Sequence, residues 1–309
     1  MTLVKLTKKQ IVCRIVILAV LLLVGFVVLV IKASPTWKPA ALNVVSTNHL
    51  RQPNPYLNPD GMTQESRILP PDGFTRTDAS PDSLASFLRS YAVYPDGTEI
   101  PVFDGTTLNP SLAAAIFDIP IGAEGYQQCA DSIIRLYTEY FYQTGQRDKI
   151  AFHLSNGFLC DYDAWCRGKR VLALGEFSCW IPALPAKDTT QTLNNYLVTI
   201  MRYAGTLSLT DESHTIPASD AHIGDFLCRG GTPGHVILIT DEAVNEQGER
   251  CFLLGQGYIP SQSFHIIAGT AEDGNPWYTE EQLAAETIAV SGNHFKPENL
   301  RRWNDGFSQ

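Results

Sequence analysis

The sequence predicts one transmembrane helix followed by an α+β domain in which a helix packs on an antiparallel sheet. Three observations carry this prediction. An uninterrupted apolar run of 17 residues covers positions 15–31, about the minimum length that spans a bilayer. From Cys129 onward, apolar side chains recur at helical spacing. Two strand-like segments, 236–240 and 251–255, are joined by Asn245-Glu246-Gln247-Gly248, the clearest hairpin in the chain.

The apolar run 15–31 is expected to be an uncleaved signal anchor. Four basic residues precede it and only Lys32 follows closely, so the positive-inside rule places the short N-terminus in the cytoplasm and the rest of the chain outside. A cleaved signal peptide is the alternative, but its apolar region would be unusually long and Val30-Ile31-Lys32-Ala33 is a poor cleavage site. Residues 1–33 are therefore assigned to a cytoplasmic stub and the anchor.

The exported part is expected to hold a linker and one domain. Residues 34–61 are rich in Pro, Asn and Thr and predict a tether that lifts the domain off the membrane. Residues 62–309 have a length that suits one α+β domain. Beyond residue 33, 18 basic residues stand against 32 acidic ones, a net charge of −14. So acidic a domain has no electrostatic footprint for a phosphate backbone, and no nucleic-acid partner is expected.

Further elements follow from local signals. A helix is expected over 80–88, where Ser-Pro-Asp supplies an N-cap and a first-turn proline. Residues 149–154 predict a strand that ends at an Asn-Gly turn. A helix is expected over 188–204, with a glycine as its stop. The pattern Thr-x-x-Gln at 279–282 is typical of a capping box, and residues 297–303 are expected to form a last short helix.

Six cysteines lie outside the membrane segment, where disulfides are permitted. If Cys129 is a free nucleophile, at least one of the other five is unpaired, whereas pairing of all six would remove the nucleophile. The short loop between Cys160 and Cys166 makes these two the most plausible bridge. No CxxC repeat is present, so a structural zinc site is not expected. The six are Cys129, Cys160, Cys166, Cys179, Cys228 and Cys251.

Cys129 is the candidate nucleophile. Gly122 and Gly125 precede the helix that it opens, so the free N–H groups and the dipole of the first turn would lower the thiol pKa and could bind an oxyanion. Cys129 also begins the apolar stripe of that helix, and cysteine is among the residue types most often buried. A packing role is therefore the alternative.

His235 is the candidate base, because it stands between a Gly/Pro-rich loop and a run of β-branched residues that aims its ring out of a strand end. Folding the hairpin about its turn places His235 opposite Tyr258 and puts Gln256 on the same face. Gln256 would orient the ring, and Asp241, on that face but toward the far end of the strand, is the second candidate. A histidine satisfied by local backbone is the alternative.

The remaining histidines give weaker signals. His153 lies in a predicted strand and is expected to be a core residue, while His265 is an alternative base. Asp220-Ala221-His222 with Asp225 matches no familiar metal-ligand spacing. We expect neither a metal nor another cofactor.

Several short motifs are spread over most of residues 65–309. They are Gln127-Gln128-Cys129-Ala130-Asp131 with Arg135-Leu136, Tyr203-Ala204-Gly205-Thr206 with Ser208-Leu209, Gly224-Asp225, Gly230 to His235, Gln256-x-Tyr258-x-Pro260-x-Gln262 and Pro276-Trp277-Tyr278. With these motifs the chain resembles a bacterial family known only as domain of unknown function 4846. The resemblance implies an exported, anchored bacterial protein in the cytoplasmic (inner) membrane, with its C-terminal domain in the periplasm, and the family brings no established activity.

A more distant resemblance bears on mechanism. A cysteine that opens a helix, then Gly234-His235-Val236, then a polar residue on the next strand is similar to the NlpC-type, papain-like cysteine peptidases, which hydrolyse peptide bonds of peptidoglycan stems. The resemblance implies that fold, with Cys129 as nucleophile, His235 as base and Gln256 as the orienting residue. Gln128 stands where many of those enzymes have Asp, and Ala130-Asp131 replaces their Ser-Gly.

These signals predict a membrane-tethered extracytoplasmic cysteine hydrolase that acts on an amide or peptide bond of the cell envelope. A non-catalytic envelope-binding module with a structural Cys129 is the alternative from a different class. Packing is the alternative role for the aromatic residues of the expected substrate site. The residues expected to contact the substrate are Gln128, Asp225, Tyr258, Gln262, Trp277 and Tyr278.

Overall fold

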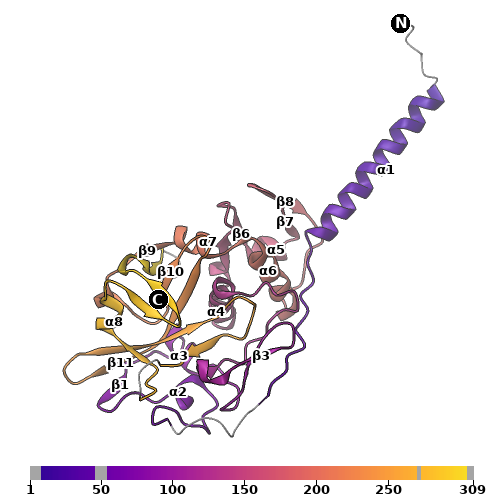
Figure 1. The fold of residues 1–309 in the computed structure, drawn as a ribbon. Helices are drawn as coiled ribbons and strands as arrows, with labels where there is room; N and C mark the ends of the chain where they lie inside the picture. The colour runs from indigo at the N-terminus through magenta and orange to yellow at the C-terminus, as the bar shows by residue number, and fades with distance from the viewer. Residues whose placement is uncertain (1–7, 46–53, 270–272, 305–309) are drawn as a thin grey trace.

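The computed structural model describes residues 8–45, 54–269 and 273–304 of the chain (Figure 1). The helices are α1 (Lys8–Lys32), α2 (Gln64–Arg67), α3 (Leu84–Arg89), α4 (Cys129–Gln143), α5 (Tyr162–Cys166), α6 (Thr190–Tyr203), α7 (Thr206–Asp211) and α8 (Glu280–Ala284). The strands up to residue 182 are β1 (Phe74–Arg76), β2 (Ile100–Pro101), β3 (Thr107–Leu108), β4 (Ala113–Ile116), β5 (Ala151–His153), β6 (Leu159–Asp161), β7 (Lys169–Leu174) and β8 (Phe177–Pro182). The later strands are β9 (Ser213–Thr215), β10 (Phe226–Arg229), β11 (His235–Asn245), β12 (Arg250–Gln256), β13 (His265–Ile267), β14 (Trp277–Thr279), β15 (Ile288–Val290), β16 (Asn293–Phe295) and β17 (Leu300–Trp303).

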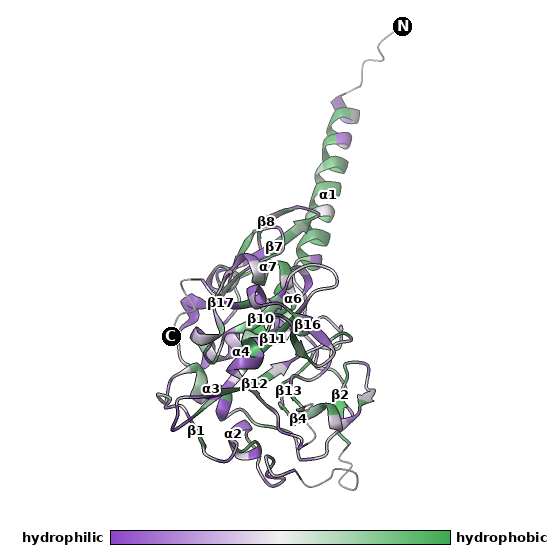
Figure 2. Cartoon of the chain, turned by 60° about the vertical axis from the view of Figure 1, so that its left-hand side comes forward, coloured by the Kyte–Doolittle hydropathy of each residue, from purple (hydrophilic) through white to green (hydrophobic). Residues whose placement is uncertain are grey.

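Helix α1 stands away from the domain and is apolar along most of its length (Figures 1 and 2). Its segment Arg14–Lys32 has 19 residues and a mean hydropathy of 3.2, and at about 1.5 Å per residue it is about 28 Å long. Among the described residues it is the one helix long and apolar enough to cross a bilayer.

The segment after α1 is not a free tether, contrary to the prediction for the first part of 34–61. The Trp37 N–H donates to Asn195 Oδ1 of α6 at 2.8 Å, Pro39 forms a β-bridge with Gly122, and the Ala40 N–H donates to Ile121 O at 2.8 Å. The polar composition predicted that this segment is surrounded by water, but the domain supplies backbone and amide partners for it. Residues 34–45 are called the strap below.

The domain is a mixed α/β structure built on a nine-stranded antiparallel sheet. Its main path runs β4-β13-β12-β11-β10-β17-β9, with β1 added to β11 and β14 added to β12. Helix α4 packs on one face of the sheet, here called the α4 face; helix α8 and the β15–β16 hairpin cover the other, here called the α8 face. Core residues of the α4 face include Cys129, Ile133, Val236, Leu238 and Leu253. Core residues of the α8 face include Ile237, Ile239, Leu254, Leu283 and Phe295.

The β11–β12 hairpin has the expected register at the end that carries His235. Leu238 lies opposite Gly255, as folding the hairpin about its turn requires. The register then shifts by one residue, so that Asp241 lies opposite Leu253. Such a bulge changes which side of the sheet each later side chain occupies. Alternation counted from His235 therefore gives the wrong face for residues beyond the bulge.

Local signals fixed some helix ends and missed others. The Thr279 and Gln282 capping box is present at the start of α8, and α6 begins after an N-cap at Thr189. Helix α3 starts at Leu84 with Ser83 as its N-cap, three residues later than the Ser-Pro-Asp pattern predicted. The expected helix over 297–303 is wrong: a single 3-10 turn, Pro297–Asn299, leads into strand β17, whose pairing with both β10 and β9 outweighs the local pattern.

All six cysteines beyond the anchor are free thiols. The suggested bridge between Cys160 and Cys166 is absent from this described part of the chain, because Cys160 lies on β6 in the core while Cys166 ends α5.

Candidate active site

Cys129 is the first residue of α4, with Gln128 as the N-cap. The carboxyl of Asp131 accepts the Gln128 N–H at 3.0 Å, and the Ser132 hydroxyl donates to the Gln128 carbonyl at 2.8 Å. These contacts fix the first turn and direct its N–H groups toward the thiol: those of Cys129 and Ala130 both favour the thiolate. The expected position of the cysteine at a helix N-terminus is present.

The pKa of Cys129 is not lowered, contrary to the prediction. The side chain is 5% exposed, and burial, followed by the charge of Asp131, raises the pKa of the thiol despite the helical N–H groups. Asp131 is itself buried, and burial raises its pKa to about 8. The resting site therefore holds a neutral thiol at neutral pH, and a base must remove its proton as it reacts.

We predict that Asp131→Asn shifts alkylation of Cys129 to lower pH. Asparagine keeps an oxygen that can accept the Gln128 N–H but removes the negative charge that opposes the thiolate. The measurement is the rate of iodoacetamide modification of Cys129 against pH, with the modified cysteine identified by peptide mass spectrometry. Asp148→Asn, at an exposed position, is the matched control, and an unchanged profile in Asp131→Asn would contradict the electrostatic account.

His235 is the first residue of β11 and is 4% exposed. Its Nε2 lies 2.8 Å from Oε1 of Gln256, and its ring meets the ring of Tyr258 edge-on at 5.0 Å between centroids. Burial lowers the pKa of His235, and the hydrogen bond to Gln256 partly opposes that effect. The imidazole is therefore neutral at neutral pH, the state that a general base needs.

A second histidine fixes the tautomer of His235 through Gln256. Burial lowers the pKa of His265 to about 4, so its ring is neutral. Its Nδ1 lies 3.2 Å from the carbonyl of Ser263 and must donate the proton, which leaves Nε2 to accept from Nε2 of Gln256 at 3.4 Å. The Gln256 amide also donates to Ser291 at 3.1 Å.

With its NH₂ group held this way, Gln256 presents only its oxygen to His235. Nε2 of His235 then carries the proton, and Nδ1 keeps a free lone pair. In the described residues Nδ1 has no hydrogen bond. The sequence predicted His265 only as an alternative base, although it is the cross-strand partner of Gln256. The contact of Gln256 with Ser291 was not predicted.

The Cys129 thiol lies against the first peptide of β11, the one that joins His235 to Val236. The N–H of Val236 points at the thiol and favours the thiolate. Cys129 and Val236 belong to the core of the α4 face, whereas strand alternation puts His235 and Gln256 on the α8 face with Ile237. The thiol and the ring thus approach the strand end from its two sides, and no hydrogen bond joins Sγ to a ring nitrogen within the described residues.

Gly257 brings the end of β12 against the first turn of α4. A Cβ at this position would lie 2.3 Å from Ser132 Oγ and 2.9 Å from the backbone oxygen of Gln128. Only glycine permits that approach without moving the helix. The absence of a side chain at Gly257 is therefore what keeps Gln256 and the thiol at the same end of the sheet.

The assignment of Asp241 as a ring-orienting residue is wrong. Its carboxylate is fully buried and accepts from Arg76 Nε at 2.6 Å and Arg89 Nε at 2.7 Å. The bulge between Ile239 and Asp241 changes the face on which it was expected. Asp241 belongs to a buried ion cluster and not to the site.

Trp277 and Tyr278 lie at the other end of β12 from Gln256, opposite Leu253 and Phe252. The Trp277 indole donates to Leu69 O at 2.8 Å, and both side chains are buried in the core. Their packing role follows from that position, and they do not line the thiol site. Tyr258 stays half-buried beside His235.

Asp225 also lies away from the thiol. It immediately precedes β10. Arg229, which pairs with His235, lies at the other end of that strand. Two hydrogen bonds of 2.8 and 2.7 Å tie its carboxylate to Arg302. It lines a cavity of about 220 Å³ together with Tyr137 and Trp303.

Gln128 and Gln262 remain near the site in different ways. Gln128 is half-exposed at the N-cap of α4, beside the thiol. Gln262 follows Tyr258 by four residues, forms a β-bridge with Val102, and is buried with its Oε1 lacking a hydrogen bond in the described structure.

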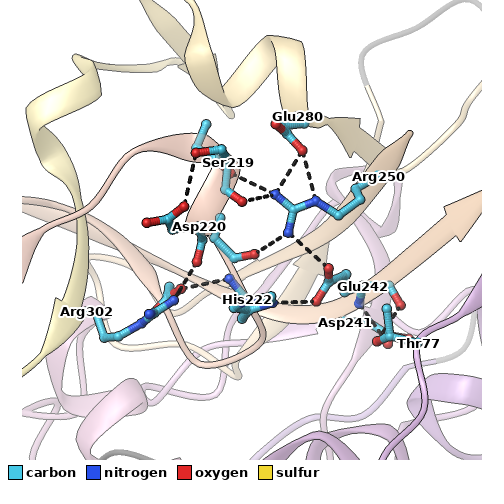
Figure 3. Close-up of polar contacts among 12 residues, drawn as sticks. Thr77, Ser219, Asp220, His222, Asp241, Glu242, Arg250, Glu280 and Arg302 are labelled. Carbon is cyan, nitrogen blue, oxygen red and sulfur yellow. Dashed lines mark hydrogen bonds and ion pairs between the residues drawn. The ribbon is translucent and has the colours of Figure 1, made fainter. Parts of the chain in front are cut away.

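The Asp220-His222 segment is held by arginines. Figure 3 shows Arg250 between Glu242 and Glu280, with hydrogen bonds to Glu242 Oε1 at 3.2 Å and Glu280 Oε2 at 2.9 Å. His222 Nδ1 lies 3.2 Å from Glu242 Oε2. Guanidinium groups therefore already balance these acidic side chains, and a cation has no need to do so.

Comparison with known proteins places the domain. The family model described as domain of unknown function (4846) matches residues 64–302. No curated protein and no solved structure matches the chain.

Proposed function

This chain belongs to the domain of unknown function (4846) family, and because that membership brings no activity with it, we propose from the site that the protein is a membrane-anchored thiol hydrolase. It cleaves an amide or peptide bond in the cell envelope. The domain faces the extracytoplasmic side of the inner membrane, a placement that the four basic residues before the apolar run 15–31 support. The proposal includes the papain-like fold of the NlpC-type peptidases, which the packing of α4 on the antiparallel sheet supports.

One observation carries the proposal: His235 has a free Nδ1, and the backbone N–H of the next residue, Val236, contacts the Cys129 thiol. Gln256 and His265 hold the ring in the tautomer in which Nδ1 is the base. The N–H groups of Cys129 and Ala130 lie at the thiol, where an oxyanion would form. A base, a nucleophile and oxyanion donors are thus present at one strand end.

The reaction follows from these roles. His235 Nδ1 takes the thiol proton as Sγ attacks the carbonyl carbon, and the helix N–H groups bind the resulting oxyanion. The imidazolium then protonates the departing amine, which leaves a thioester on Cys129. Water, deprotonated by His235, attacks the thioester, the carboxylic acid departs, and the proton returns to the thiol. Attack requires Sγ to swing toward Nδ1, a contact that catalytic groups often complete only with substrate bound.

One observation favours the rival function, a non-catalytic binding module of the envelope. The thiol is buried and neutral, and no hydrogen bond ties it to His235 in the described structure. Under this alternative Cys129 is a packing residue, and Cys129→Ala leaves every interaction of the protein intact.

The test is to incubate the full chain, in lipid vesicles, with peptidoglycan stem peptides and to trap the thioester with hydroxylamine. We expect the parent protein to release amine and to yield an acyl hydroxamate, because hydroxylamine cleaves the thioester on Cys129, and we expect neither product from Cys129→Ala. Cys179→Ala removes a half-buried thiol on β8 and is the matched control. Amine release by Cys129→Ala would overturn the proposal.

A further inference from the structure

The strap after α1 holds the domain close to the bilayer. Only residues 33–36 separate the end of α1 from Trp37, whose N–H is bound to Asn195 on α6. At about 3.5 Å per residue, the five steps from Lys32 to Trp37 reach at most about 18 Å. If α1 crosses a membrane, the surface of the domain around α6 therefore lies at that membrane.

The β7–β8 hairpin lies close to the lower end of α1 on this surface. It rises beside the lower turns of α1 in both Figure 1 and Figure 2. Its strands lead into α6 through residues 183–189. The hairpin is fastened to the domain, because the Trp180 ring packs on Phe158 at 5.4 Å and Asn156 donates to Ser178 at 2.8 Å.

Two large apolar side chains stand uncovered at the tip of this hairpin. Leu174 and Phe177 are cross-strand partners and are 62% and 61% exposed. Single exposed apolar residues are ordinary, but a paired leucine and phenylalanine at the tip of a fastened hairpin form a patch. Burying these side chains in lipid would be favourable, because it removes their apolar surface from water.

We propose that the tip of the β7–β8 hairpin, Leu174 and Phe177, inserts into the lipid surface from which α1 emerges. The helix and the hairpin then form two points of membrane contact, and the domain is held with one fixed side toward the bilayer. Exposed Glu176 lies in the turn between Leu174 and Phe177, so the insertion is shallow and its carboxylate stays among the hydrated head groups.

Photocrosslinking in the full chain tests this contact. p-Benzoylphenylalanine is introduced singly at Phe177, at Val20 in α1 and at Met62, and the protein is reconstituted into vesicles that contain phosphatidylglycerol with an alkyne-tagged acyl chain. Val20 reports on the anchor. Met62 is 52% exposed and lies two residues before α2, which is on the side of the domain away from α1 in both views (Figures 1 and 2).

We expect lipid adducts at positions 20 and 177, with about tenfold or more adduct at 177 than at 62, because each 1.4 kcal/mol of burial is a factor of ten in occupancy. Lipid adduct at 20 without adduct at 177 overturns the proposal, and so does a crosslink from 177 to a second protein chain. Absence of adduct at 20 also overturns it, by removing the anchor on which it rests. None of these outcomes depends on hydrolase activity.

Discussion

Asp241→Ala is expected to lower the free energy of unfolding by about 3–5 kcal/mol, because it leaves the buried guanidinium of Arg89 and the half-buried one of Arg76 without their counter-charge. The Asp241 carboxylate is fully buried and joins Arg76 of β1 to Arg89 of α3, whose side chains are 18% and 7% exposed. It also accepts the Glu242 N–H at 2.9 Å. One carboxylate thus connects a strand, a helix and the bulged part of β11, near Thr77 (Figure 3).

The measurement is chemical denaturation of the full chain in detergent, followed by the circular dichroism of the domain. Asp78→Ala removes an exposed carboxylate from the same region, without an ion pair in the described structure, and should change the free energy by less than about 0.5 kcal/mol. If the loss in Asp241→Ala is as small as in this control, the ion cluster does not stabilise the fold. Asp241→Leu combined with Arg89→Met is expected to recover part of the loss, since an apolar pair of similar volume replaces the buried ion pair and only the half-buried Arg76 keeps an unpaired charge.

The difference between Gln256 and Asp241 shows how far sequence could predict the site. Both were placed on the face of His235 by alternation along a hairpin. For Gln256 the prediction needed only the register between 235 and 256, which is regular, and the side chains meet at 2.8 Å. For Asp241 it also needed the bulge and two arginines more than 150 residues away in the sequence, at positions 76 and 89. Local sequence patterns were enough to predict the position of Gln256. They carry no information on the bulge and the distant arginines that determine the position of Asp241.

The protonation state of Cys129 was mispredicted for a related reason. A helix N-terminus is visible in the sequence, and its N–H groups do favour the thiolate. Burial is a property of the whole fold, and it outweighs those groups. The strap at residues 34–45 is a similar case, because polar composition says that a segment is soluble but not whether a domain offers it partners.

His235→Ala is expected to slow hydrolysis of a stem-peptide anilide by about 10²–10⁴-fold, the usual contribution of a general base. The effect should be near the upper end, because the thiol pKa is raised and little thiolate forms without a base. The lowered pKa of His235 places the acid limb of the pH–rate profile below the ordinary imidazole value of 6.5. Activity is then retained as the pH falls toward that limb and is lost when Nδ1 becomes protonated.

Gln256→Leu separates orientation from basicity. Loss of its oxygen frees the tautomer of His235, so the rate at neutral pH falls, and it removes the hydrogen bond that raises the His235 pKa, so the acid limb moves to still lower pH. His214→Ala, at an exposed histidine on β9, is the control and should leave rate and profile unchanged. A rate loss in Gln256→Leu with the acid limb unmoved would assign Gln256 to packing, because a residue that only fills space cannot shift the titration of the base. A His235→Ala protein that remains folded and keeps the parental rate would remove the imidazole from the reaction altogether.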